Sequence, residues 1–305
     1  MNDKKTVIVI AGPTAAGKTE LAIRLARHLQ TEIISADSRQ CYRELNIGVA
    51  RPLPSELSAI PHHFIATHSI YEKVTAATFE AFALAKTLEL FASHSTVVMV
   101  GGTGLYIDAF CHGLDVIPPI PEATRAALTD KYNQEGLEWL QKEVALKDPK
   151  YYSEGEIHNP HRLLRALEVM NTTGRSIQEF KQRRAQERPF NILKFALEIP
   201  KERLHQRINQ RVDAMMDSGL LSEVESLLPA RHLPALQTVG YKELFSFLDN
   251  ETDLPAAVAA IKLHTRQYAK RQRTWFRRDA RYQHIELSDY TLVEAQVLAH
   301  LATAK

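Results

Sequence analysis

An octapeptide near the N-terminus carries the most specific chemical signal in this sequence. It is Gly12-Pro13-Thr14-Ala15-Ala16-Gly17-Lys18-Thr19, which fits the pattern G-x-x-x-x-G-K-[ST]. The glycines let backbone N–H groups turn inward around a phosphate, and the N-terminus of a following helix adds partial positive charge. Lys18 can neutralise the terminal phosphate, and the Thr19 hydroxyl can bind Mg²⁺. An ordinary glycine-rich turn is the alternative, and the pattern does not say which phosphate compound is bound.

A carboxylate that could work beside this loop follows another apolar run. P-loop proteins that hydrolyse nucleotides usually end a second apolar strand in an Asp that helps to hold Mg²⁺. Here Val97–Val100 ends in glycines, whereas Ile33–Ala36 is followed by Asp37. Asp37 is therefore a candidate metal-associated acid, catalytic base or helix N-cap, and the sequence leaves these roles open.

The elements around these residues indicate a parallel α/β sheet. Short, fully apolar runs alternate with helical patterns, as buried parallel strands require. We expect strands at 6–11, 32–35, 96–100 and 192–199, and helices at 18–29, 75–92, 200–218, 256–277 and 290–302. Strands that alternate with helices favour a doubly wound sheet, so the expected fold class is α/β with a P-loop NTPase-like core.

A change of composition divides the chain. Leu114–Pro121 carries three prolines, and the residues from Glu122 to about Phe180 are rich in Ala, Leu and Glu, with no convincing strand. We therefore expect a helical insertion domain within the α/β core. The predicted boundaries are 1–113 for the first part of the core, 114–190 for the insertion, and 191–305 for the rest of the core and the C-terminal helices.

Composition and charge narrow the class of function. The 305 residues carry a formal net charge of +2, yet Lys262–Arg281 holds eight Lys/Arg and one acid, a local charge of +7. Such asymmetry indicates a polyanionic partner. Two isolated cysteines, Cys41 and Cys111, favour neither a disulfide framework nor a zinc site. We expect neither a secretory signal nor a membrane span, and therefore a cytoplasmic protein.

Basic residues recur at helical spacing near the C-terminus and could follow RNA phosphates. Their positions are i, i+4, i+7 and i+11: Arg266, Lys270, Arg273 and Arg277. Aromatic residues of the same segment could stack on a base: Tyr268, Trp275 and Phe276. A second basic cluster follows the insertion: Lys181, Arg183, Arg184 and Arg188. The alternative is a solvated basic face with buried aromatic rings.

Taken in order, the motifs resemble those of the tRNA dimethylallyltransferase (tRNA isopentenyltransferase) family over roughly residues 5–280. They are GPTAAGKT (12–19), SADSRQCY (35–42), NIGVARP (46–52), PHH (61–63), GGTGLYI (101–107), NPHRLLRALE (159–168), QTVGYKE (237–243) and RQYAKRQRTWFR (266–277). The resemblance implies transfer of a dimethylallyl group from dimethylallyl diphosphate to N6 of the adenine 3′-adjacent to the anticodon. It also implies that the phosphate loop holds the diphosphate instead of ATP, and that the insertion binds the anticodon stem-loop.

The same resemblance assigns roles to single residues. It makes Asp37 the general base, places Thr103 near the bridging oxygen and Arg211 on the diphosphate, and adds Lys18 and Mg²⁺ as charge stabilisers. Arg207 lies one helical turn from Arg211 and could share its role. Besides Asp37 and Thr103, the implied tRNA-binding residues are Ser38, Arg39, Gln40, Arg125, His161, Arg162, Leu163, Leu164, Arg165, Lys270 and Arg273. Arg162 could instead pair with Glu168.

Some positions depart from the family pattern. Asn46, Val49 and Arg51 stand where Asp, Thr and Lys are expected, and the segment 156–161 is shorter than usual. The pair His62-His63 lacks further metal-ligand spacing and is interpreted as structural. The sequence leaves two rival functions open, a P-loop kinase that uses ATP and a non-catalytic RNA-binding protein. We expect a monomer.

Overall fold

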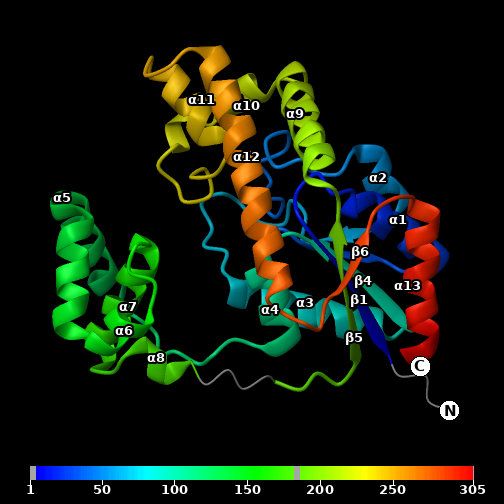
Figure 1. The fold of residues 1–305 in the computed structure, drawn as a ribbon, viewed down its shortest axis with the longest axis horizontal. Helices are drawn as coiled ribbons and strands as arrows, with labels where there is room; N and C mark the ends of the chain where they lie inside the picture. Colours follow the sequence, from blue (N-terminus) through cyan, green and yellow to red (C-terminus); the bar gives the residue numbers. More distant parts are fainter. Residues whose placement is uncertain (1–4, 182–185, 305) are drawn as a thin grey trace. The chain divides into compact units, whose positions relative to one another are not determined.

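A computed structural model describes residues 5–181 and 186–304 and contains two compact units. One unit holds the chain up to His112 and from Glu187 onward, and the other is Gly113–Gln186. Figure 1 shows the larger unit as a sheet with helices on both faces. The fold class expected from the sequence, a P-loop NTPase-like α/β core with a helical insertion, is confirmed.

A six-stranded sheet forms the centre of the larger unit, with the order β3-β2-β4-β1-β5-β6 and every pairing parallel. The strands are β1 (Thr6–Ala11), β2 (Ile33–Ala36), β3 (His62–His63), β4 (Thr96–Gly101), β5 (Asn191–Glu198) and β6 (Gln283–Glu286). Val7 and Val9 join the hydrophobic core on one face, whereas Ile8 and Ile10 join the core on the other. This alternation explains why the central strands are apolar without interruption.

Helices of the larger unit pack on both faces of this sheet and on one another. They are α1 (Lys18–His28), α2 (Pro54–Ala59), α3 (Ala76–Leu90), α4 (Gly104–His112), α9 (Lys201–Asp217), α10 (Leu220–Ser226), α11 (Tyr241–Leu248), α12 (Leu254–Arg277) and α13 (Tyr290–Ala304), with the 3₁₀ helix η1 at Leu228–Ala230. Asp253 caps α12 by accepting a hydrogen bond from the Ala256 N–H at 2.7 Å. None of the helices in the described part of the chain combines the length and apolar composition that crossing a membrane requires.

The two edge strands were not predicted from the sequence. The C-terminal region, expected to be mostly helical, contributes β6, which pairs with β5 through Phe195 and Gln283. At the opposite edge, His62-His63 forms β3 and pairs with Ile33-Ile34. Each strand is short and partly exposed, so it lacks the continuous apolar run by which a buried strand is recognised.

The smaller unit is helical and has a core of its own. It contains α5 (Glu122–Lys147), α6 (Pro149–Glu154), α7 (Pro160–Thr173) and α8 (Ile177–Phe180). Its core is formed around Leu128, Leu140, Val144, Tyr151, Leu163, Ala166, Leu167, Val169 and Ile177. The backbone of α5 departs from helical geometry at Gly136, where φ is 78°. A separate core explains why this stretch can be inserted between two strands without disturbing the sheet.

The last residues of the expected insertion belong to the larger unit. Arg188 donates hydrogen bonds to the carbonyls of Phe110 and Ala109, and it forms a 2.7 Å ion pair with Glu80. Phe190 is buried and stacks with Phe110 at a centroid distance of 5.8 Å. Arg183 and Arg184, two of the basic residues predicted to contact RNA, lie outside the described residues.

Candidate active site

Two adjoining cavities lie beside the phosphate loop and the carboxyl end of β2, within the larger unit. The main cavity has a volume of about 280 Å³, and the adjoining cavity about 100 Å³. They share the lining residues Thr14, Asp37, Val49, Ala50, Arg211 and Tyr268. In open α/β sheets, ligands bind outside the carboxyl ends of the strands. The position is therefore that of an active site.

The phosphate loop connects β1 to α1 as predicted. Gly17 is the N-cap of α1 with φ 93°, a backbone conformation that favours glycine. A Cβ at this position would also collide with the Tyr290 hydroxyl, which lies over the loop. The loop and the first turn of α1 line the cavities through Thr14, Lys18 and Thr19. Backbone N–H groups at the start of a helix are a suitable site for an anion.

Lys18 is partly buried beneath the loop, so its charge is incompletely solvated. Its ammonium donates a 2.6 Å hydrogen bond to the Pro13 carbonyl. Burial and the nearby Arg211 together lower the pKa of Lys18 to about 7, although the charge of Asp37 opposes both effects. A bound phosphate would favour the protonated form, because an opposite charge nearby stabilises the ammonium.

Two arginines of α9 approach the phosphate loop from the side. Arg211 Nη1 lies 3.4 Å from the Thr14 hydroxyl, and Arg207 Nη1 lies 3.4 Å from the Ala16 carbonyl. Burial and the neighbouring Arg207 lower the pKa of Arg211. The spacing of four residues puts both side chains on one face of the helix. With Lys18 they place three cationic side chains around one loop, which favours an anionic ligand.

Asp37 lies where β2 ends, and its carboxylate has two different environments. Oδ1 accepts hydrogen bonds from the backbone N–H groups of Arg39 at 2.8 Å and Gln40 at 3.2 Å. These bonds fix a turn rather than a helix start, so the helix N-cap role is wrong. Within the described chain, no group donates a hydrogen bond to Oδ2, and Asp37 lines both cavities. One carboxylate oxygen is thus held while the other can accept a proton.

Thr103 lies next to the Asp37 turn but outside the lining of the two cavities. Its hydroxyl accepts a 3.1 Å hydrogen bond from the Ser38 N–H and lies 3.4 Å from the Ser38 hydroxyl. Burial raises the pKa of the neighbouring Tyr268 to about 12, as does the charge of Asp37, while a hydrogen bond with Thr103 opposes the rise. Thr103 therefore links the end of β4, the turn after β2 and α12.

The Gln40 side chain is occupied by protein partners. Its amide nitrogen donates to the Val49 carbonyl at 3.2 Å and the Ala50 carbonyl at 3.0 Å. Its amide oxygen accepts from the Ser35 hydroxyl at 3.2 Å. Reading the edge of an adenine would require an amide with free donor and acceptor positions. In this structure Gln40 instead orients the segment that carries Val49.

Gln272 lines the adjoining cavity, a position that was not predicted from the sequence. Its amide oxygen accepts a 2.8 Å hydrogen bond from the Thr14 N–H, and its amide nitrogen donates to the Gly102 carbonyl at 2.9 Å. The side chain is buried, on the face of α12 that also carries Ala269 and Phe276. A polar residue within an apolar helical stripe was the available signal. It joins the phosphate loop to the end of β4.

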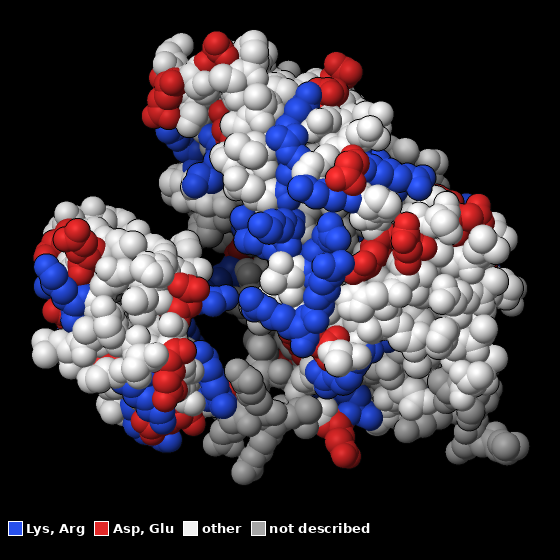
Figure 2. Space-filling model, viewed as in Figure 1, with Lys and Arg blue, Asp and Glu red and all other residues white. Residues whose placement is uncertain are grey.

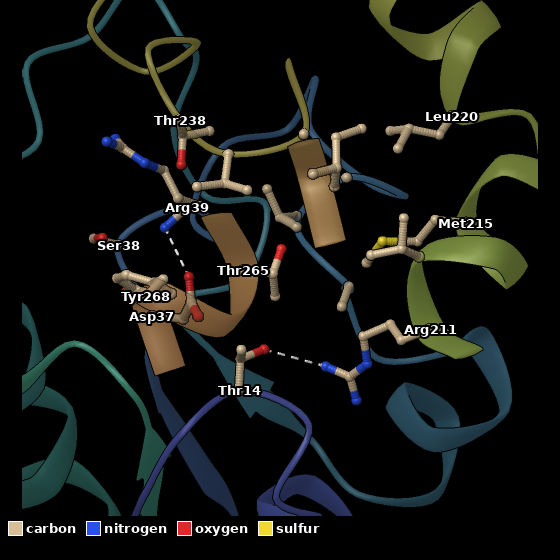
Figure 3. A pocket seen from close by; sticks show the side chains of 17 residues that line it. Thr14, Asp37, Ser38, Arg39, Arg211, Met215, Leu220, Thr238, Thr265 and Tyr268 are labelled. Atoms are coloured by element: carbon tan, nitrogen blue, oxygen red, sulfur yellow. Dashed lines mark hydrogen bonds between the residues drawn. The ribbon is translucent and has the colours of Figure 1, made fainter. Parts of the chain in front are cut away.

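One side of the main cavity is apolar, and no motif predicted it. Figure 3 shows Met215 and Leu220 on the side of the cavity away from Asp37 and Ser38, with Arg211 below Met215 on that same side of the view. We call this region the apolar end; it consists of Val49, Val212, Met215, Leu220, Val239 and Ile261. These residues come from five separate segments of the chain. A small aliphatic group next to an anion is the ligand that fits such a lining.

The basic helix expected near the C-terminus is α12. Some of its basic side chains form ion pairs within the protein and others do not. Lys262 pairs with Asp213 at 2.5 Å, and Arg277 pairs with Glu198 at 2.9 Å. Among the residues described, Lys270 and Arg273 form no ion pair, and Lys270 is exposed. Figure 2 shows a band of Lys and Arg side chains over the region of α12. These charges are available to a polyanion.

The aromatic residues of α12 separate into different roles. Phe276 is 1% exposed, so the prediction that it could stack on a base is wrong. Trp275 donates a 3.1 Å hydrogen bond from its indole N–H to Asp108 Oδ2. Tyr268 is 37% exposed and lines both cavities, so it can meet a flat ligand.

The insertion carries the predicted RNA contacts around α7. Arg125 and Arg165 both pair with Glu168, at 3.1 and 3.0 Å, so Glu168 is engaged by these two arginines. His161 and Arg162 are exposed at the N-terminal end of α7, where a phosphate is favoured. Leu163 is fully buried in the core of the insertion, so its side chain cannot reach RNA. Leu164 is partly buried.

Among the described residues, one cluster has the composition of a metal site: Asp108, His112 and Asp279. The buried Lys194 ammonium bonds to Asp279 and lies 3.1 Å from His112 Nε2, so a cation already neutralises the cluster. Burial lowers the pKa of His112 to about 4, as do Lys194 and Arg281. We interpret this cluster as a structural network. His62-His63 is also structural, with His63 paired to Glu32 at 2.5 Å.

The fold and the site together define a P-loop enzyme whose cavity has a cationic phosphate loop, a carboxylate and an apolar end. Residues 40–279 match the IPP transferase family. The chain is 45% identical over 302 residues to tRNA dimethylallyltransferase 1 of Bacteroides thetaiotaomicron, which covers 97% of each chain. It therefore belongs to the IPP transferase family and is a prenyltransferase, as the motifs predicted.

Solved structures agree with this assignment. The tRNA isopentenylpyrophosphate transferase of Bacillus halodurans matches with a TM-score of 0.73 at 32% identity, over 98% of both chains. A eukaryotic dimethylallyltransferase acting on tRNA matches with a TM-score of 0.75 at 25% identity, over 94% of this chain and 75% of that chain.

Proposed function

We propose that this protein transfers a dimethylallyl group from dimethylallyl diphosphate to N6 of the adenine 3′-adjacent to the anticodon in tRNA, and releases diphosphate. The observation that carries the proposal is the main cavity, in which Asp37, the Thr14–Arg211 pair and an apolar end face one space. A donor that joins a diphosphate to a five-carbon aliphatic group matches this lining, because the diphosphate can contact Thr14 and Arg211 and the aliphatic group can contact the apolar end. The family relationship supports the same reaction.

The carboxylate of Asp37 would accept a proton from the nucleophile. An exocyclic adenine amine becomes a good nucleophile only as it loses a proton during attack. As N6 bonds to C1 of the dimethylallyl group, the C1–O bond breaks and its electron pair leaves with the diphosphate. The N6 proton passes to Oδ2 of Asp37, because Oδ1 is held by the Arg39 and Gln40 N–H groups. An adenine must leave the base stack to reach this atom.

Cationic groups would stabilise the leaving diphosphate. Negative charge develops on the bridging oxygen in the transition state, so cations placed beforehand lower the barrier. Lys18 and Arg211 line the adjoining cavity, and Arg207 approaches the same loop. We assign the diphosphate contacts to these side chains and to the backbone N–H groups at the start of α1. We also propose that Thr103 contacts the bridging oxygen, because its hydroxyl lies beside Ser38, which lines the main cavity.

Mg²⁺ fits this site by its donor atoms. The adjoining cavity is lined by the Thr19 and Ser35 hydroxyls and by Asp37, and oxygen atoms are the ligands that Mg²⁺ prefers. Thr19 would hold the ion together with diphosphate oxygens. When bound, Mg²⁺ neutralises part of the diphosphate charge. We also propose that the protein acts as a cytoplasmic monomer; light scattering coupled to size exclusion tests the oligomeric state.

The proposed RNA contacts come from both units. In the insertion they are Arg125, His161, Arg162, Leu164 and Arg165, and in the larger unit they are Ser38, Arg39, Lys270 and Arg273. Basic side chains bind RNA mainly through phosphates, so the affinity should depend strongly on salt. Neutralising Lys270 and Arg273 together should reduce the slope of log affinity against log salt by about 2. An unchanged slope would remove α12 from the RNA-binding surface.

The direct test is incubation of the protein with dimethylallyl diphosphate, Mg²⁺ and an unmodified tRNA with adenine after an anticodon that ends in A. Nucleosides are then analysed by mass spectrometry for N6-dimethylallyladenosine. A parallel reaction with labelled ATP and small-molecule acceptors tests the rival kinase function. The kinase is disfavoured because β4 ends in Gly101 rather than in an acid. Phosphorylation of an acceptor without any prenylated nucleoside would reject the proposal.

A further inference from the structure

The segment that carries Val49 is held by one carboxylate from α10. Glu223 Oε2 accepts hydrogen bonds from the backbone N–H groups of Asn46 at 3.2 Å and Ile47 at 2.7 Å. Glu223 Oε1 accepts from the Gly48 N–H at 3.0 Å and from the Tyr241 hydroxyl at 2.6 Å. Four donors thus converge on two oxygens, in the geometry by which successive N–H groups bind an anion. We call this arrangement the Glu223 clamp.

Tyr241 completes the clamp from α11. It is fully buried, and burial together with Glu223 raises the pKa of its hydroxyl, which stays neutral and donates to the carboxylate. Its ring lies so close to Gly48 that a Cβ there would come within 2.7 Å of ring atoms. The ring therefore fixes how closely the 46–50 segment can approach α11.

The clamp joins the segments that form one region of the main cavity. Leu220 lies three residues before Glu223 on α10, Val239 lies two residues before Tyr241, and Val49 follows Gly48. All three apolar side chains line the apolar end. The same 46–50 segment also accepts the Gln40 amide through the Val49 and Ala50 carbonyls. One carboxylate thus sets the spacing between three walls of the apolar end and connects them to the turn that carries Asp37.

We propose that Glu223, with Tyr241, is a positioning residue that sets the width of the apolar end and thereby the affinity for, and the chain-length selectivity of, the prenyl donor. This inference rests on the proposed function. Without the clamp, Val49 can move away from Leu220 and Val239, so a five-carbon chain loses contacts and a ten-carbon chain gains room. Glu223 does not line the cavity, so its effect reaches the donor only through these three side chains.

The test compares the wild-type protein with Glu223→Gln and Tyr241→Phe. A glutamine has one carbonyl oxygen, so at least one backbone N–H of residues 46–48 must then face an amide N–H. We expect Glu223→Gln to raise KM for dimethylallyl diphosphate about tenfold and to change kcat less than about threefold, because only the binding walls loosen. Tyr241→Phe keeps the ring against Gly48 and loses one hydrogen bond, so about a threefold rise is expected.

Selectivity gives a readout that a general loss of stability would not produce. In competition between geranyl and dimethylallyl diphosphate, both variants should use a larger share of the ten-carbon donor than the wild type. Glu225→Gln changes an exposed acid of the same helix and is the matched control, with wild-type KM and selectivity expected. Melting temperatures are measured for all variants, and Tyr241→Phe decides the outcome if Glu223→Gln does not fold.

Two results would overturn the inference. One is a folded Tyr241→Phe or Glu223→Gln variant with wild-type KM and wild-type donor selectivity. The other is a loss confined to kcat, which would place Glu223 in the chemical step. If the wild type makes no prenylated tRNA, the proposed function fails instead. Calorimetric dissociation constants for dimethylallyl diphosphate alone then test whether the Glu223 clamp affects donor binding. Equal dissociation constants for the wild type and Glu223→Gln would reject the proposed role of the clamp.

Discussion

The polar and the apolar ends of the main cavity are built in different ways. The polar end comes from short, continuous motifs: residues 12–19 supply the phosphate loop, and residues 35–40 supply Asp37 and its turn. The apolar end gathers single side chains, such as Met215 from α9 and Val49 from a loop. The difference indicates that charge and proton transfer depend on local backbone geometry. The fit of the aliphatic group depends on how distant segments pack.

Replacement of Asp37 by Asn should give the largest effect on turnover and show that the chemical step takes place at the polar end. Asn keeps a carbonyl oxygen for the Arg39 and Gln40 N–H groups, so the turn is preserved, but no carboxylate remains to accept the N6 proton. We expect kcat to fall by about 10²–10⁴ with donor affinity near that of the wild type. Single-turnover formation of prenylated tRNA measures it.

Asp217→Asn, an exposed position at the end of α9, is the matched control for this change. Wild-type turnover in Asp37→Asn would contradict the role of Asp37 as the base. It would also end the assignment of the chemical step to the polar end.

The pH dependence of donor binding should reveal Lys18. Because burial lowers its pKa to about 7, the free enzyme loses the Lys18 charge as the pH rises through that value. Anion binding requires the protonated form, so donor affinity should fall by roughly tenfold between about pH 6 and pH 8. Calorimetric titration measures the affinity, and Lys18→Arg is the comparison, since a guanidinium stays charged and should flatten the profile. Parallel pH profiles for the wild type and Lys18→Arg would mean that ionisation of the donor, not of Lys18, causes the pH dependence of donor affinity.

Truncation of Met215 should give the smallest effect, and this effect should be on KM, whereas Asp37→Asn affects kcat. Met215→Ala removes apolar contact with the aliphatic group, worth about 1 kcal/mol, so KM for the donor should rise roughly fivefold with kcat nearly unchanged. Met216→Ala is the control, since Met216 packs on the same core without lining the cavity. Inorganic diphosphate should bind both variants equally well. Weaker binding of diphosphate to Met215→Ala would show that the two ends are not independent.

Features that depend on residues close together in the chain could be predicted from the sequence. The phosphate loop, the parallel sheet and the helical insertion follow from glycine spacing and from apolar runs, which require no knowledge of distant partners. The prediction that Phe276 could stack on a base was wrong, because spacing along a helix does not say which face packs against the sheet. Gln272 was not predicted, because its hydrogen bonds to the Thr14 N–H and the Gly102 carbonyl exist only in the folded chain.

By itself, the sequence determined the class of chemistry. Lys18, Asp37 and the glycines around them have the residue types and spacing that hold an anion and accept a proton, because neighbouring backbone groups impose those geometries. Only the tertiary structure decided what shares the cavity with that anion. The apolar end and the Glu223 clamp join residues more than 150 positions apart, and packing and hydrogen bonds between such residues form only when the whole chain is folded.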